Sequence, residues 1–262
     1  GLRLLLLAGE ILCWLLLLAE LDRQGLPRSH LLLAAWLPLP VIEGYLPAHV
    51  DTLALPWIAL FLLLLHRRRH LAAGPALALA CLVKPLGVVF IPAFLRETGW
   101  RQGFRAALLC LALALLAYLP FAGAGRHLFS TLWAMASRWS FNGSLGGVLE
   151  AVLPQALARP VLALLLALLL LLGAWRGRDL QARLLLASAA FLVCTPTLFP
   201  WYLLTLVPLL ALRPEPALVA LCLTAPAAEM VMIPWQTARQ WSLPWWVQAM
   251  EYAPFYGLLA WG

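Results

Sequence analysis

Three ionisable side chains, Glu43, His49 and Asp51, lie within nine residues of one another in an otherwise apolar stretch. An imidazole and a carboxylate two residues apart can bind a divalent cation, orient a phosphate or transfer a proton. Simpler readings stay open, because Asp51 can cap the following helix, His49 can be exposed to water, and Glu43 can supply a supporting hydrogen bond. We interpret the three as substrate-binding residues.

Lys84 is the only lysine among the eighteen basic residues, and it lies near the middle of the apolar segment 71–95. A charge at the bilayer centre costs about 2.5–3.5 kcal/mol on insertion scales, so a lysine there suggests a functional site. A compact ammonium group suits a phosphate as a point charge. The alternatives are snorkelling to the membrane surface and a structural pair with Glu10 or Glu43.

Trp201 and Tyr202 in "TLFPWYLL", together with Arg138 in "RWSFNGSL", complete the candidate substrate-binding set. A tryptophan face can stack on a sugar ring, although an aromatic belt at the membrane surface explains Trp201 and Tyr202 as well. Arg138 can contact a phosphate from a loop. The five cysteines lack metal-site spacing, and we interpret them as small buried hydrophobic residues.

The composition identifies the class of protein that positions these residues. The chain is 64% hydrophobic and 11% charged, against about 25% charged residues in soluble domains. Its apolar runs reach the length of about 20 residues that a membrane-spanning helix needs, and they lack the alternation of a transmembrane barrel. We therefore predict an all-α polytopic membrane protein. Because its basic residues flank apolar runs, the net charge of +7 reflects topology, and no nucleic-acid partner is expected.

Arginine placement sets the topology, because basic loops stay on the cytoplasmic side. If successive loops alternate strictly between the two sides of the membrane, the basic loops all agree with this rule except at 71–95. There, Lys84 and Pro85 interrupt the apolar run. A re-entrant helical pair there puts twelve arginines inside and leaves five outside. The twelve are Arg23, Arg28, Arg67, Arg68, Arg69, Arg96, Arg101, Arg105, Arg176, Arg178, Arg183 and Arg213.

About eight spanning helices accompany this pair. They are expected at residues 2–19, 31–46, 52–65, 106–120, 157–175, 183–199, 201–212 and 216–233. We predict a single transmembrane domain over residues 1–262, with an extracytoplasmic loop at 121–156. Apolar residues recur at helical spacing from Leu128 to Trp139, so this loop should hold a helix lying along the membrane surface.

Several motifs resemble those of bacterial GT-C glycosyltransferases, especially polyprenyl-phosphate-mannose-dependent mannosyltransferases. "WLPLPVIEGYLPAHVDTLALP" resembles the "NPLVIxE" and "GHxD" run of that family, with Glu43, His49 and Asp51 matching and Ala48 in place of the glycine. "ACLVKPLGVVFIPAFL" resembles a family segment through Lys84, Pro85 and Pro92. "PWYLLTL" and "RWSFNGSL" resemble its later motifs.

The resemblance implies transfer of a hexose such as mannose from a polyprenyl-phosphate donor, on the extracytoplasmic face of a bacterial inner membrane. The acceptor would be a glycan, a lipid or a protein, and a divalent cation could assist. The family's catalytic base is an acidic residue of an earlier external loop, which has no counterpart here. We therefore expect the chain to be a fragment, inactive alone, with its base upstream of residue 1.

Two other functions stay open. A transporter or lipid flippase would also use a broken helix and a charge near the bilayer midplane. Such a protein should show two related halves, and the sequence contains no convincing repeat. A non-catalytic scaffold is the third possibility, but it would not need Lys84 within a broken segment.

Overall fold

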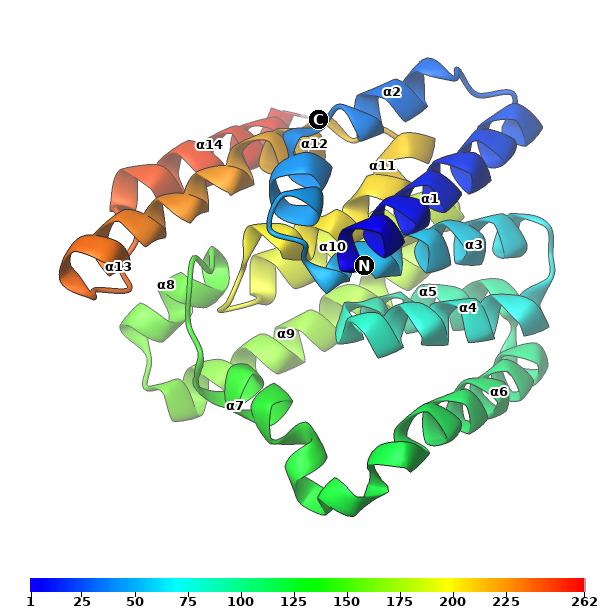
Figure 1. The fold of residues 1–262 in the computed structure, drawn as a ribbon, viewed down its shortest axis with the longest axis horizontal. Coiled ribbons are helices and arrows are strands. Elements are labelled where there is room, and N and C mark those ends of the chain that lie inside the picture. Colours follow the sequence, from blue (N-terminus) through cyan, green and yellow to red (C-terminus); the bar gives the residue numbers. More distant parts are fainter. Residues whose placement is uncertain (262) are drawn as a thin grey trace. The chain divides into compact units, whose positions relative to one another are not determined.

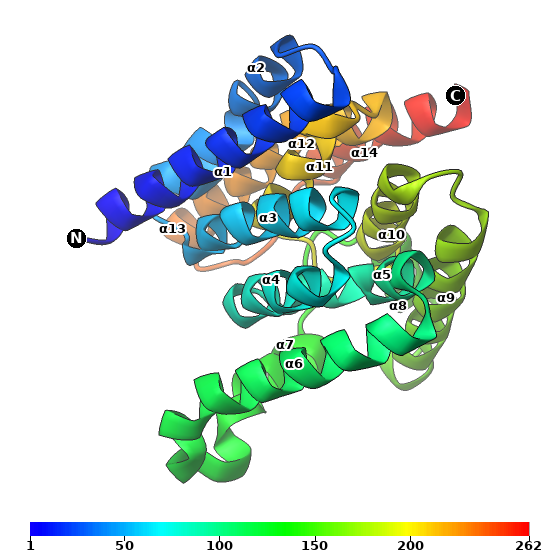
Figure 2. The same cartoon turned by 90° about the vertical axis from the view of Figure 1, so that its right-hand side faces the viewer.

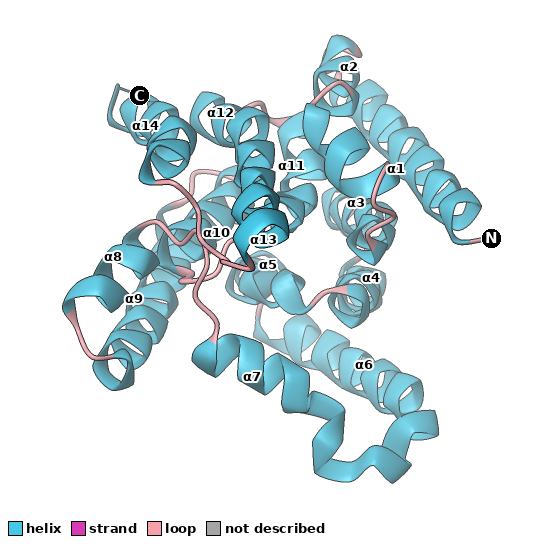
Figure 3. Cartoon of the chain, turned by 60° about the vertical axis from the view of Figure 1, so that its left-hand side comes forward, coloured by secondary structure: helices cyan, strands magenta, loops and turns pink. Residues whose placement is uncertain are grey.

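The structure is a computed structural model that describes residues 1–261. Over these residues the chain is helical, and the only β-type pairing consists of two isolated bridges at Thr197 (Figure 3). The predicted all-α class is confirmed. The helices form two compact units, one made of Gly1–Ala59 with Leu198–Gly262 and the other of Leu60–Thr197.

The first unit is built around α11, whose six residues are all buried and which packs against α1 and α2. Its helices are α1 (Leu2–Gln24), α2 (Ser29–Ala35), α11 (Val207–Leu212), α12 (Pro216–Thr224), α13 (Met232–Ala238) and α14 (Trp245–Trp261). Four short irregular helices join them: the π-helix η1 (Pro40–Tyr45) and the 3-10 helices η2 (Val50–Ala54), η5 (Pro200–Leu206) and η6 (Ala225–Val231). Helix α3 (Leu55–His66) begins here and continues into the second unit.

In the second unit, α4 packs along α6 and α9 packs along α10 (Figures 1 and 2). Its helices are α4 (His70–Val83), α5 (Ile91–Thr98), α6 (Trp100–Tyr118), α7 (Ser130–Arg138), α8 (Leu145–Val152), α9 (Gln155–Arg176) and α10 (Leu180–Cys194). The 3-10 helices η3 (Pro85–Phe90) and η4 (Leu119–Phe129) complete it. Helix α7 has no buried residue.

Four helical stretches in the described part of the chain are long and apolar enough to cross a membrane: Leu2–Gln24, Trp100–Arg138, Gln155–Arg176 and Pro216–Ala238. They contain the predicted spans 2–19, 106–120, 157–175 and 216–233. The chain is therefore a membrane protein. The stretch Trp100–Arg138 joins α6, η4 and α7 and is kinked at Gly125, where φ is 51°.

The segment 31–46, predicted as one span, is interrupted. Helix α2 ends at Ala35, and the chain becomes the π-helix η1 from Pro40. Pro38 and Pro40 supply no backbone N–H, so a regular helix cannot run through them. Glu43 consequently lies in a π-helix, a conformation that is frequent at functional sites.

The helix in segment 71–95 is interrupted just before Pro85, as predicted. Helix α4 ends at Val83, Lys84 is extended (φ −146°, ψ 122°), and Pro85 begins η3. Arg68, just before α4, donates a 3.0 Å hydrogen bond to Glu97 at the end of α5. The start of α4 and the end of α5 therefore lie at the same end of the second unit.

Candidate functional site

Glu43 is buried close to other polar side chains of the first unit. Its side chain is 1% exposed, and its Oε1, like the buried Oγ1 of Thr52, has no hydrogen-bond partner among residues 1–261. A Cβ at Gly44 would lie 2.9 Å from that hydroxyl and 3.9 Å from Oε1 of Glu10, so only glycine fits between them. Because buried polar groups are normally satisfied, these two atoms suit a ligand that both donates and accepts hydrogen bonds.

A second acidic residue acts on the same carboxyl group. Glu229, in η6, interacts electrostatically with Glu43. Glu10 and Glu229 are carboxyl groups within apolar runs, and neither is among the predicted site residues. Their isolation in those runs was the only signal, because the contacts with η1 join segments far apart in the chain.

His49 and Asp51 lie at the start of η2. The N-cap position belongs to His49, which makes no side-chain capping bond, while the buried Asp51 lies inside the 3-10 turn. Asp51 thus lies in the first turn of η2 and not at its N-cap position. Ala48, which precedes them, has a φ of 58°, a left-handed conformation that suits glycine.

Trp201 is enclosed between two rings. His49 stacks on it at 4.3 Å between centroids and 22° between planes, and Phe199 stacks at 4.5 Å and 6°. Since two rings this close cannot share one face, both faces of the indole are covered. A sugar would have to displace one ring before it could stack on Trp201. The indole instead orients His49.

Tyr202 completes the aromatic group. Its ring meets the edges of Phe199 at 5.7 Å and of Trp201 at 6.3 Å, and it interacts electrostatically with Asp51. Helix η5 also packs against both η1 and η2. The first unit thus brings together five of the seven predicted site residues: Glu43, His49, Asp51, Trp201 and Tyr202.

The other two, Lys84 and Arg138, belong to the second unit. Lys84 is half-buried at the break between α4 and η3, and Arg138 is the exposed last residue of α7. Arg138 is followed by the segment 139–147, which lies against residues 195–197. Thr197 donates to the carbonyl of Trp139 at 2.7 Å, and the N–H of Phe141 donates to Pro196 at 3.0 Å.

Arg159, on α9, anchors this segment. Its guanidinium donates to the carbonyls of Ala136 at 2.6 Å and Trp139 at 2.5 Å, and it forms an ion pair with Glu150. Sequence reasoning missed this role, because an arginine near the start of a predicted span carries no sign of which carbonyls it will bind. The contacts fix the end of α7, and so the backbone position of Arg138.

Two glycines allow the close approach. A Cβ at Gly143 would lie 2.7 Å from the carbonyl oxygen of Pro196, and one at Gly146 would lie 2.5 Å from that of Thr195. Glycines are common at tight turns, where they adopt a positive φ. The left-handed residue is instead Asn142, with φ 51°, and the glycines serve backbone packing.

Within residues 1–261, no three His, Cys, Asp or Glu side chains are grouped so as to hold a metal ion. A cation bound by His49 and Asp51 would therefore need further oxygen ligands, such as those of a phosphate.

The sequence model of glycosyltransferase family 87 matches residues 2–200. The matched region contains Glu43, His49, Asp51, Lys84 and Arg138, and it ends one residue before Trp201. No curated protein matches the chain, and no solved structure does.

Proposed function

This chain belongs to glycosyltransferase family 87, and we propose that it transfers a sugar from a polyprenyl-phosphate donor to an acceptor on the extracytoplasmic face of a bacterial inner membrane. The sugar is a hexose such as mannose, following the resemblance to GT-C mannosyltransferases. The acceptor is a glycan, a lipid or a protein.

The observation that carries this proposal is the pair of buried polar atoms at Glu43 and Thr52. Glu43 offers a buried acceptor and Thr52 a buried hydroxyl, both without partners in the described chain. A sugar hydroxyl donates one hydrogen bond and accepts others, so it matches both groups. His49, which stacks on Trp201, and Asp51 lie in the neighbouring turn at the start of η2. These groups support a ligand rich in hydroxyl groups.

In the proposed reaction, the cationic residues of the second unit act on the phosphate that leaves. The acceptor oxygen attacks C1 of the sugar, the bond from C1 to the phosphate oxygen breaks, and the lipid phosphate leaves as an anion. A carboxylate takes the hydroxyl proton, a role that the resemblance gives to an external-loop acid. Lys84 offsets the charge of the departing phosphate, and Arg138 adds a second cationic contact.

The topology in this proposal has eight spans and one re-entrant pair. Its support is the ion-pair cluster at Glu97, which binds Arg68 and Arg183 at 3.0 Å each. That cluster brings the turn before α4, the last turn of α5 and the first turn of α10 together at one end of the second unit. These turns are rich in arginine, as expected for cytoplasmic loops.

Lys84→Ala in the full-length protein tests the proposed chemistry. Transfer from a radiolabelled polyprenyl-phosphate hexose in membrane vesicles should fall about 100-fold, since a charge-assisted contact at the leaving group is lost. Lys84→Arg should recover part of the rate, and Arg28→Ala, at an exposed turn, should match the wild type. Full turnover by Lys84→Ala would remove Lys84 from the mechanism. If transfer occurred only from a nucleotide sugar, the proposed polyprenyl-phosphate donor would be wrong.

A further inference from the structure

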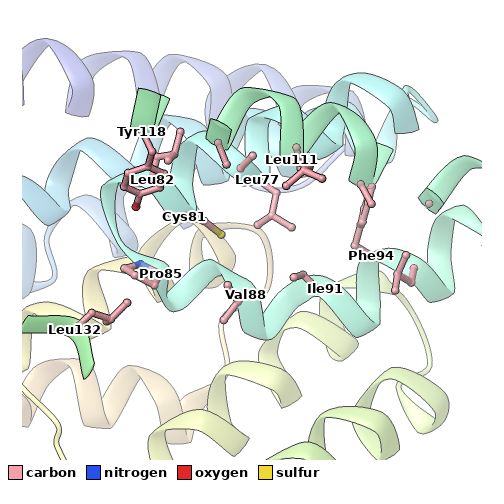
Figure 4. Close-up of a pocket in the computed structure, with 16 residues that line it drawn as sticks. Leu77, Cys81, Leu82, Pro85, Val88, Ile91, Phe94, Leu111, Tyr118 and Leu132 are labelled. Atoms are coloured by element: carbon pink, nitrogen blue, oxygen red, sulfur yellow. The ribbon is translucent and has the colours of Figure 1, made fainter. Parts of the chain in front are cut away.

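A cavity of about 500 Å³ lies within the second unit, between α4, η3, α5 and α6 (Figure 4). Leu77, Val88, Ile91, Phe94 and Leu111 point into it, and nearly all of its lining is hydrocarbon. The polar side-chain groups are two thiols and the hydroxyl of Tyr118. Its ligand should therefore be apolar.

The cavity exists because of side-chain size. Helix α6 faces it with Gly103, Ala107, Cys110 and Ala114, small residues at positions that share one helical face. The wall opposite is broken at Lys84–Pro85, so no continuous helix closes the space. The apolar side chains that line this space are partly exposed, so an apolar occupant would remove them from water or fill the space with lipid.

Its length fits one hydrocarbon chain. The lining residues of α6 extend from Gly103 to Tyr118, a rise of about 22 Å at 1.5 Å per residue. That is most of the ~30 Å hydrocarbon core of a bilayer. The cavity opens to the surface of the unit, because its lining residues Val88, Ile91 and Leu111 are 50%, 42% and 56% exposed, so a lipid chain can enter it from the bilayer.

Charge distinguishes the two ends of the cavity. At one end, the lining residues Leu95 and Gly103 are close in sequence to the exposed Arg96, Arg101 and Arg105. Glu97, the nearest carboxylate, is already bound by Arg68 and Arg183. Trp100, 81% exposed at the start of α6, suits the headgroup level of a membrane. The opposite end has Lys84 beside the lining residue Pro85.

We propose that this cavity binds one acyl chain of an anionic bilayer phospholipid, with the headgroup among Arg96, Arg101 and Arg105. Three arginines outweigh the single lysine at the other end, and anionic lipids are attracted to basic residues at the membrane surface. The site requires only that the chain lies in a membrane. It does not depend on the identity of the sugar donor.

Photo-crosslinking tests the site. The full-length protein is placed in phosphatidylcholine vesicles that contain phosphatidylglycerol with a diazirine on one acyl chain. Crosslinks should map to lining residues such as Ile91 and Ala114. Ala114→Trp, which fills the cavity, should lower these crosslinks about tenfold. Ala112→Trp, on the opposite face of α6, is the control and should leave the crosslinks unchanged. If Ala114→Trp does not fold, Ala107→Leu fills the cavity with a smaller side chain.

The headgroup has its own test. Replacing Arg96, Arg101 and Arg105 together by glutamine should remove a preference of about tenfold for phosphatidylglycerol over diazirine-labelled phosphatidylcholine. Crosslinks confined to the outer face of α6, or equal labelling by both lipids in the unmodified protein, would overturn the proposal. So would stronger competition by polyprenyl phosphate than by phosphatidylglycerol, because the cavity would then hold the donor chain. That last result would leave the proposed transferase activity intact.

Discussion

Two regions of the molecule that join distant parts of the chain do so in opposite ways. In the first unit, η1 and η2 meet η5 through stacked rings, and the polar atoms of Glu43 and Thr52 are left without partners in the described chain. In the second unit, the segment 139–147 meets residues 195–197 through backbone hydrogen bonds, glycine contacts and Arg159. The first region therefore leaves hydrogen-bonding capacity at Glu43 and Thr52, whereas the contacts of the second region hold a chain segment in place.

Buried carboxylates sharpen this difference. Glu20 and Glu43 are each 1% exposed. Glu20 accepts hydrogen bonds from Arg23 at 2.6 and 2.9 Å and from Gln24 at 2.6 Å, all within one helical turn. Glu43 has an oxygen with no partner among the described residues. Equal burial therefore accompanies a structural role in one case and a candidate binding role in the other.

Glu43→Gln should give the largest effect. Sugar transfer should fall about 10- to 100-fold, because a hydrogen bond to a charged acceptor is weakened. The thermal midpoint in detergent should stay the same or rise, since a buried acceptor that lacks a partner is replaced by a neutral group. Glu20→Gln is the matched control, with the opposite outcome of lower stability and normal transfer per folded molecule. Equal loss of stability in both variants would break the comparison.

Gly146→Ala tests the second region. The added Cβ would lie 2.5 Å from the carbonyl oxygen of Thr195, so the two backbones must separate. Overpacking of this kind costs about 1–3 kcal/mol, and denaturant unfolding in micelles should show that loss. Gly147→Ala is the control, because its Cβ would have no neighbour within 4 Å. Identical stability of the two variants would contradict the proposed backbone contact.

Sequence reasoning succeeded where the cause of a structure is local. Four spans follow from apolar length alone, and the break at Lys84 follows from the proline after it. Proline also interrupts the helix in segment 31–46, at Pro38 and Pro40. A continuous span was predicted there because the apolar run is long enough to cross a membrane.

The site was only partly accessible from the sequence, because its contacts join distant segments. Glu43, His49 and Asp51 stand out as charges in an apolar run, and the structure brings them near Trp201 and Tyr202. The covering of Trp201 by Phe199 depends on how η5 folds back, and the role of Arg159 depends on two carbonyls at least twenty residues away. Neither has a sequence signature.

Arg159→Gln should have an intermediate effect. Loss of the guanidinium removes the donors to Ala136 and Trp139 and leaves Glu150 without its cation. Stability should fall by about 1–3 kcal/mol, measured by denaturant unfolding. If the freed end of α7 also displaces Arg138, the KM for the lipid donor should rise while kcat is retained. Arg126→Gln, at an exposed position of η4, is the control for charge alone. An unchanged KM would restrict Arg159 to a structural role.

Ala48→Gly should give the smallest effect, a slight gain in stability. A non-glycine residue in the left-handed region costs about 1–2 kcal/mol, and Ala48 has a φ of 58°. Glycine removes that strain but adds about 0.5–1 kcal/mol of unfolded-state entropy, so the net gain should be at most about 1.5 kcal/mol. Ala54→Gly, at the helical end of η2, should instead lower the thermal midpoint. If both variants lost stability alike, the turn before His49 would not need a left-handed residue, and the glycine of the resembling "GHxD" motif would require another explanation.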